Sequence, residues 1–270
     1  MSSLQSFVRR LQKKKVVNPD KYKVRYSDPI TAAQSLARNG IVIIDHPYST
    51  SHSWSHTELC SAAHLSEDAS SYVHSANIFD LARQKHSLRL QRGIHDTIDR
   101  GMLDVFNPIT NGLPHLESTL TAHEDIFVPI LSRLAEIQNC SLAFSHTNLY
   151  LYTNVITPRC LHIDSLSKQI KVFLTLSPIN KLSQGPFCYV PKTNNMKLLH
   201  LFTLLINNIF GSDLGNYPKT DSTLVNSNQA LPLLVPSFTL FICMQNGVHG
   251  DLPCMTNFSR ASFVWNYSLK

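Results

Sequence analysis

Residues 149–176 read LYLYTNVITPRCLHIDSLSKQIKVFLTL, and this stretch decides how the chain folds. Its two ends, 149–156 and 170–176, are rich in aromatic and β-branched residues, which is typical of β-strands. Between them stands the tripeptide His162-Ile163-Asp164. In an extended segment residues i and i+2 point to the same side, so the imidazole and the carboxylate would converge on one point.

His-x-acid tripeptides are common in this chain because it holds 13 histidines. On a helix the same spacing turns the two side chains apart, so a helical context disfavours a shared ligand. His123 and Asp125 lie in residues 120–137, whose apolar residues recur at helical spacing, and we expect His123 to be solvated or to cap the helix. We expect the same of the tripeptides in short polar stretches, and context favours 162–164 over all of them. The other matches are His56-Thr57-Glu58, His115-Leu116-Glu117, His123-Glu124-Asp125 and His249-Gly250-Asp251.

Two later segments can complete a site. His249 follows an apolar run of strand length at 237–244, and Arg260 and Ser262 share one face of a further strand. Two histidines and one carboxylate with open positions suit non-haem Fe(II) oxygenases, and a guanidinium fork suits a distal carboxylate better than lysine does. The pattern favours oxidation, although Arg260 could instead point outward and pair with a surface acid.

From about residue 142 to the C-terminus the sequence resembles the phytanoyl-CoA dioxygenase family of Fe(II)/2-oxoglutarate oxygenases. The segments that carry the resemblance are Asn148-Leu-Tyr-Leu-Tyr152, Leu161-His-Ile-Asp-Ser165, Lys171-Val-Phe-Leu-Thr-Leu176, Gly185-Pro-Phe-Cys-Tyr-Val-Pro191 and His249-Gly250. The family usually continues Gly-Ser-His after the fourth segment, where this chain has Lys192-Thr193-Asn194. That difference concerns a loop rather than the metal ligands.

The resemblance implies a mainly β fold with flanking α-helices, built on a double-stranded β-helix (jelly-roll, cupin-like) core. It implies Fe(II) bound by His162, Asp164 and His249, with Arg260 and Ser262 holding the distal carboxylate of the cosubstrate 2-oxoglutarate. Asn148 and Lys171 match positions near the cosubstrate, and Asp104, Phe106 and Asn107 are candidate substrate contacts because N-terminal segments commonly wall the pocket in this family.

Asp164 also bears on the reaction that the resemblance implies. Halogenating relatives carry a small residue in place of the carboxylate, so a carboxylate favours hydroxylation or a related oxidation such as desaturation. The expected reaction consumes O2 and 2-oxoglutarate, releases succinate and CO2, and oxidises a small organic molecule. The family name does not imply a coenzyme A thioester.

Charge divides the chain into an arm and a body. Residues 1–25 carry eight Lys and Arg against one Asp, a net charge of +7, which leaves −1 for the rest of a chain whose formal net charge is +6. We expect a basic arm at 1–25 and one oxygenase domain at 26–270, with a helical elaboration at about 26–141 and the core at about 142–270. A hydrophobic content of 43% is ample for such a core.

Other signals narrow the class of protein. The six cysteines form no C-x-x-C pair and no signal peptide is evident, which indicates reduced thiols in the cytoplasm. No apolar run reaches the length of a membrane span, and residues 196–210 are expected to form a packing helix or a lid. The oligomeric state is not readable.

Two alternatives stay open. A metal-binding jelly-roll protein without redox chemistry would keep the histidines but would have no need of Arg260 and Ser262. An oxygenase directed to nucleic acid by its basic arm should show a wider basic face, and the neutral body makes nucleic acid the less expected partner.

Overall fold

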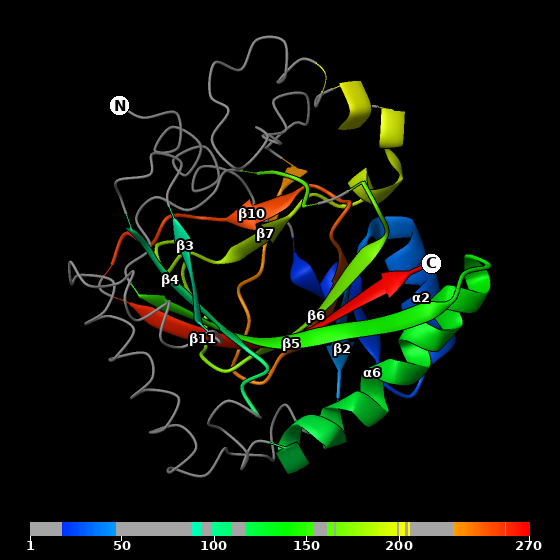
Figure 1. Cartoon of the computed structure of the whole chain (residues 1–270), viewed down its shortest axis with the longest axis horizontal. Helices are drawn as coiled ribbons and strands as arrows, with labels where there is room; N and C mark the ends of the chain where they lie inside the picture. The colour runs from blue at the N-terminus through cyan, green and yellow to red at the C-terminus, as the bar shows by residue number, and fades with distance from the viewer. Residues whose placement is uncertain are drawn as a thin grey trace.

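The computed structural model describes most of the chain outside its N-terminal segment and several connecting segments (Figure 1). The described residues are 18–46, 88–92, 99–109, 117–153, 161–164, 166–198, 200–202, 205, 229–256 and 258–270. Residues 1–17 of the basic arm, Ser165 and residues 206–210 of the expected helix or lid lie outside them.

Eight strands form one large sheet whose order is β1-β2-β9-β6-β11-β5-β4-β3. All neighbours in it are antiparallel except the pair β1 and β2. In chain order the strands are β1 (Lys23–Arg25), β2 (Ile41–Asp45), β3 (Leu88–Arg92), β4 (Asp99–Phe106), β5 (Leu142–Thr153), β6 (Gln169–Thr175), β9 (Leu240–Met244) and β11 (Ser259–Leu269).

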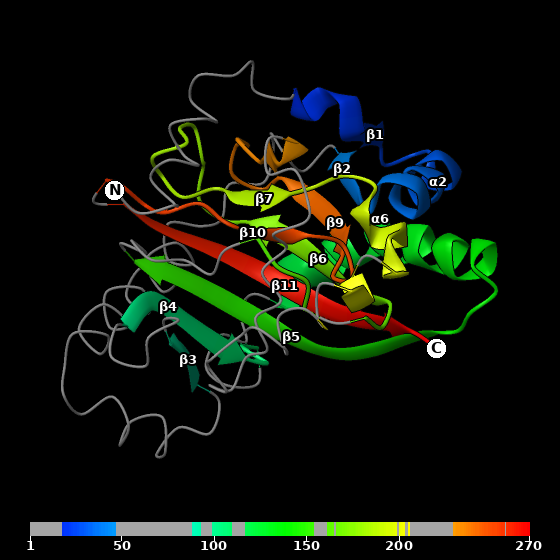
Figure 2. The ribbon, with the colours of Figure 1, turned by 90° about the horizontal axis from the view of Figure 1, so that it is seen from above.

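A second sheet of three strands, in the order β10-β7-β8, lies over one face of the large sheet (Figure 2). Its strands are β7 (Phe187–Tyr189), β8 (Leu231–Pro232) and β10 (His249–Asp251). Phe187 packs between the sheets, with its ring centroid 5.3 Å from that of Phe173 on β6 and 5.6 Å from that of Phe241 on β9. We call the face of the large sheet that meets this layer the inner face.

The opposite, outer face of the large sheet is covered by the helices α2 (Pro29–Asn39) and α6 (Glu117–Ile137) (Figure 2). Asp28 caps α2 by accepting a hydrogen bond from the Thr31 backbone, and Gly40 ends it at φ 74°, a conformation that glycine adopts at no steric cost. Short 3-10 turns occur at Pro19–Tyr22 and Thr193–Asn195. The class predicted from the sequence, mainly β with flanking helices, is confirmed, and the jelly-roll winding stays a prediction.

Alternate residues of strand β11 lie on opposite faces of the large sheet. Phe263, Trp265 and Tyr267 belong to the core against the helices, where the Trp265 indole donates a 2.7 Å hydrogen bond to Glu124 of α6. The alternate residues Ser262 and Val264 are also buried but pair with inner-face residues of β5 and β6. A period of two therefore separates packing against the helices from the lining of the interior.

His123 differs from its expected role. It lies inside α6 with 1% of its surface exposed and meets His46 edge to face, with ring centroids 5.4 Å apart. The prediction that His123 is solvated or caps the helix is therefore wrong. Because His46 is itself buried and its Nε2 donates to the Phe238 carbonyl at 3.0 Å, the two imidazoles form part of the packing between α6 and the sheet.

This packing should make stability depend on pH. Burial and the neighbouring His123 lower the pKa of His46 from 6.5 to about 4. Since the folded state then binds fewer protons than the unfolded state, the stabilisation is complete above pH 6.5 and is lost as the pH falls towards 4. Urea unfolding between pH 4.5 and 7.5 should show a shallower pH dependence for His46→Asn than for the unaltered protein, by up to about 1.4 kcal/mol per pH unit for one proton. Equal slopes would contradict the expectation.

Candidate metal centre

Backbone pairing brings two distant segments to one place. His162 and His249 exchange hydrogen bonds, with N···O distances of 2.7 Å and 2.8 Å, and the Asp164 amide donates to the Gln245 carbonyl at 3.1 Å. The turn before β6 and the start of β10 are therefore joined by an antiparallel bridge. This bridge sets the side chains of His162, Asp164 and His249 beside one another.

The three side chains offer one ligand atom each, and these atoms all lie within 4.8 Å of one another. His162 Nε2 is 3.2 Å from Asp164 Oδ1, and His249 Nε2 is 3.6 Å from Asp164 Oδ2. The two imidazole centroids are 4.6 Å apart. Among the described residues this is the one group of three or more such side chains that could hold a metal ion.

The arrangement fits one face of an octahedral ion. Ligands about 2.0–2.2 Å from a metal and at right angles to each other stand roughly 3 Å apart, close to the separations seen here. The Nδ1 atom of His249 lies 2.9 Å from the Gly247 carbonyl, which can only accept a hydrogen bond. Nδ1 therefore carries the proton, and Nε2 presents its lone pair to the site.

The carboxylate is held by a partly buried lysine, whose side chain is 20% exposed. Lys171 on β6 places its Nζ 3.0 Å from Asp164 Oδ2 and 5.7 Å from the centroid of the Tyr150 ring. Burial raises the pKa of Asp164, but the charge of Lys171 and the contacts with His249 and His162 outweigh it and bring that pKa well below its usual value. Burial lowers the pKa of Lys171, and Asp164 more than compensates and raises it. Asp164 is therefore ionised and able to bind a cation.

The loop before His249 is fixed by a close contact. Tyr189 on β7 donates a hydrogen bond to the Met244 carbonyl at 3.0 Å and lies against Gly247. A Cβ atom at residue 247 would approach the Tyr189 Oη to 1.8 Å, so no larger residue fits without moving the ring or the loop. Gly247 also supplies the carbonyl that orients His249, so this packing supports the ligand directly.

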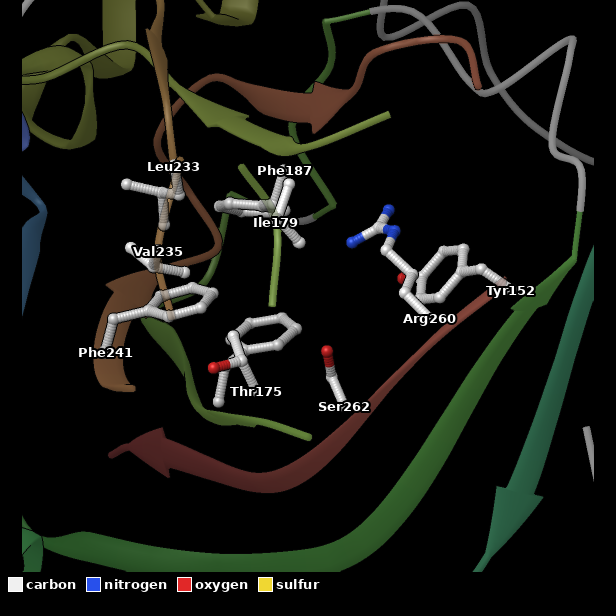
Figure 3. Close-up of a pocket in the computed structure, with 10 residues that line it drawn as sticks. Tyr152, Thr175, Ile179, Phe187, Leu233, Val235, Phe241, Arg260 and Ser262 are labelled. Atoms are coloured by element: carbon white, nitrogen blue, oxygen red, sulfur yellow. The ribbon is translucent and has the colours of Figure 1, made fainter. Parts of the chain in front are cut away.

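A small cavity lies along the inner face of β11 (Figure 3). Arg260, Ser262 and Thr175 provide its polar groups, and aromatic and aliphatic side chains provide the rest. Its volume of ≈ 10 Å³ is about that of one water molecule, so a five-carbon diacid fits only if lining side chains move. The remaining lining residues are Tyr152, Phe173, Ile179, Phe187, Leu233, Val235 and Phe241.

Arg260 points inward rather than to the surface. It is 7% exposed, its Nη2 donates to Asp251 Oδ1 at 2.7 Å, and its Cζ lies 3.8 Å from the centroid of the Tyr152 ring. Neither Asp251 nor Tyr152 was among the residues that the sequence pointed to. The His249-Gly250-Asp251 tripeptide and the alternation of Tyr150 with Tyr152 were the signals that could have found them.

The remaining candidates lie further along the same sheet. Asn148 is buried on β5 and its Oδ1 accepts a 2.7 Å hydrogen bond from Asn266, which pairs with Lys171 across β11 and β6. Residues 104 and 106 of β4 pair with Tyr150 and Asn148 of β5. Asn107, at φ 44°, uses its Oδ1 to accept from the Thr147 amide at 3.2 Å and so supports the connection after β4. The substrate-binding roles of Asp104, Phe106 and Asn107 stay predictions.

No family model matches the sequence, and no curated protein sequence is similar to it. Solved structures are nevertheless similar in fold. One of them is the non-haem α-ketoglutarate-dependent epimerase SnoN of nogalamycin biosynthesis. The match has a TM-score of 0.53 and 14% sequence identity, and it spans 90% of this chain and 83% of the SnoN chain. The chain therefore has the same fold as this α-ketoglutarate-dependent enzyme.

Two further structures support this assignment of the fold. The carbocyclase SnoK, also from nogalamycin biosynthesis, has a TM-score of 0.52 at 14% identity and covers 88% of this chain and 83% of its own. AviO1 from Streptomyces viridochromogenes Tue57 has a TM-score of 0.51 at 14% identity, with coverage of 89% and 95%. Membership of the phytanoyl-CoA dioxygenase family stays a prediction. Within the described part of the chain, no helix is long and apolar enough to span a membrane.

The metal centre can be tested through its carboxylate. Asp164→Ala should lower Fe(II) affinity by more than the roughly 10–100-fold that loss of a ligand's hydrogen-bond partner typically costs, while the circular dichroism spectrum stays unchanged. Anaerobic equilibrium titration with Fe(II) measures this. His123→Ala is the matched control: it removes a buried histidine and should lower stability while leaving metal stoichiometry intact. Loss of iron in the control, or retained affinity in Asp164→Ala, would place the metal elsewhere.

Proposed function

We propose that this protein is an Fe(II)- and 2-oxoglutarate-dependent dioxygenase that oxidises a small organic molecule. One observation carries the proposal. A set of two histidines and one carboxylate is assembled at β10 of the small sheet, and Asp251 of the same strand bonds a buried arginine that lies beside a serine on the inner face of β11. A metal and a diacid can therefore be held in one interior.

Each residue has a defined task in this proposal. His162, Asp164 and His249 would hold the iron from one side and leave the opposite positions open. The Arg260 fork would bind the distal carboxylate of 2-oxoglutarate, and Ser262 would donate its hydroxyl beside it. Lys171 would keep Asp164 ionised, and Asn148 on β5 would act near the cosubstrate, where it already accepts a hydrogen bond from Asn266.

Iron and 2-oxoglutarate, when bound, supply the oxidising chemistry: O2 and the cosubstrate are consumed, succinate and CO2 leave, and one oxygen atom enters the substrate. The protein contributes position and exclusion of water. Aromatic side chains of Phe173, Phe187 and Phe241 line the cavity beside Arg260 and make most of its surface apolar. SnoN and SnoK are an epimerase and a carbocyclase, so epimerisation and ring closure join hydroxylation and desaturation as outcomes to test.

The expected partner is a small molecule, and the expected location is the cytoplasm. The nucleic-acid alternative depends on the basic arm, most of which lies outside the described residues. Of its described basic residues, Lys23 pairs with Asp45 at 3.5 Å. Removal of residues 1–17 should leave turnover of a small substrate unchanged.

The first test is whether the chain binds iron and 2-oxoglutarate together. Anaerobic addition of Fe(II) and then 2-oxoglutarate should produce the weak visible charge-transfer band of the chelate. Exposure to O2 with candidate substrates should then release succinate in step with product. Absence of the band in protein that binds Fe(II) would exclude the proposed cosubstrate.

The diacid site predicts a specific defect for Arg260. Arg260→Ala should weaken 2-oxoglutarate binding by at least about 30-fold, because truncating one partner of a buried charge pair costs roughly 2–5 kcal/mol, and Fe(II) affinity should not change. Arg260→Lys should recover only part of the loss because lysine lacks the two-pronged geometry. The exposed Arg133, which pairs with Glu136, offers Arg133→Ala as the control. Unchanged 2-oxoglutarate affinity in Arg260→Ala would move the diacid site elsewhere.

A further inference from the structure

Asp251 stands beside the arginine that the proposed cosubstrate would contact. It lies two residues after His249 on β10, so both side chains point from the small sheet towards the inner face. Its Oδ1 accepts the 2.7 Å hydrogen bond from Arg260 Nη2. The Arg260 side chain is 7% exposed and that of Asp251 is 20% exposed, so the pair is largely withdrawn from water.

Two side chains, Tyr152 and Asp251, contact the Arg260 guanidinium from different sides. Arg260 Cζ lies over the Tyr152 ring, 3.8 Å from its centroid, and this contact limits the movement of the guanidinium. Asp251 accepts a hydrogen bond from one terminal nitrogen and so limits its rotation. A guanidinium has five N–H donors, so one accepted hydrogen bond leaves donors for another carboxylate.

Arg260 lines the cavity along the inner face of β11 and also a second small cavity beside it. Figure 3 shows the Arg260 side chain directed into the space bounded by Ile179, Phe187 and Tyr152. Of the described residues, Asp251 is not among those that line this cavity, although Arg260 is. Asp251 therefore contacts the arginine from outside the space in which a ligand would lie.

We propose that Asp251 is a positioning residue for 2-oxoglutarate: it holds Arg260 so that the donors facing the cavity receive the distal carboxylate. This inference rests on the proposed function. It gives the His249-Gly250-Asp251 tripeptide two separate tasks, since His249 faces the metal and Asp251 faces the arginine that grips the far end of the cosubstrate.

Charge provides the second part of the argument. A buried guanidinium without a partner is costly, and Asp251 compensates it whether or not a diacid is bound. The opposite hypothesis is that Asp251 competes with the diacid for Arg260. The two hypotheses predict opposite changes in affinity: removal of a positioning residue weakens 2-oxoglutarate binding, whereas removal of a competitor strengthens it.

The test compares two 2-oxo acids that differ only at the far end. Calorimetry under anaerobic conditions measures the affinity of the Fe(II)-loaded protein for 2-oxoglutarate and for 2-oxopentanoate, which lacks the distal carboxylate. Asp251→Ala should weaken 2-oxoglutarate binding by about 10-fold or more and leave 2-oxopentanoate binding within about 2-fold. Asp251→Asn, whose amide oxygen can still accept from Nη2, should restore most of the difference and guards against a folding defect in the alanine variant.

A matched control removes a carboxylate that pairs with a cation away from the site. Asp45 on β2 is 3.5 Å from Lys23 with about half of its side chain exposed, and Asp45→Ala should change neither affinity. In steady-state assays Asp251→Ala should raise the KM for 2-oxoglutarate while kcat at saturating cosubstrate changes little. A merely structural defect would lower the binding of both acids together.

Several results would overturn the inference. Tighter 2-oxoglutarate binding in Asp251→Ala would show that Asp251 competes with the diacid. If the affinities for both acids fall equally, or if neither changes, Asp251 has no positioning role. If the unaltered protein binds 2-oxoglutarate and Asp251→Ala binds it with the same affinity, the inference about Asp251 fails but the proposed function stands. If the unaltered Fe(II)-loaded protein binds neither acid, the proposed function fails and the inference falls with it.

Discussion

The antiparallel bridge between His162 and His249 is the contact on which the candidate site depends. Two backbone hydrogen bonds join a turn before β6 to the first residue of β10, and a third joins Asp164 to Gln245. Because backbone geometry fixes the direction of Cβ, this pairing sets two imidazoles and a carboxylate side by side before any metal arrives. The Tyr189 and Gly247 contact then holds the loop that carries the distal histidine.

The two faces of the large sheet pack against different parts of the protein. Apolar residues of β5, β6, β9 and β11 alternate between a core under α2 and α6 and an interior under the small sheet. The outer core stabilises the fold without contributing to chemistry. Polar and charged residues can therefore gather on the inner face without interrupting the outer core, while the inner face keeps an apolar cluster of its own.

Charge is balanced in pairs within this interior. The partly buried Lys171 pairs with Asp164, and the buried Arg260 pairs with Asp251, so each cation has a carboxylate within hydrogen-bond distance. Such pairs stabilise a fold little compared with apolar packing, but breaking one leaves a buried charge uncompensated. Both pairs place a cation at a fixed point, one beside the candidate metal ligands and the other at the cavity.

The sequence by itself determined the strands that carry the site and the residue types in it. Aromatic and β-branched residues at 149–156 and 170–176 predicted strands, which the structure has as β5 up to Thr153, the last described residue there, and as β6. The position of His162 and Asp164 between them separated this tripeptide from its rivals. The period of two placed Arg260 and Ser262 on one face of their strand, and the burial of both in the structure shows that this face points inward. These features are local, so the spacing of residues is enough to predict them.

Only the tertiary structure decided which distant residues meet. Asp251 beside Arg260, Tyr152 against the guanidinium and Lys171 on Asp164 all depend on strand register between segments far apart in the chain. The pairing of β2 with β9 and the burial of His123 against His46 have the same origin. A single sequence records the period within each strand but not the pairing between strands, because that pairing is chosen by packing of the whole molecule.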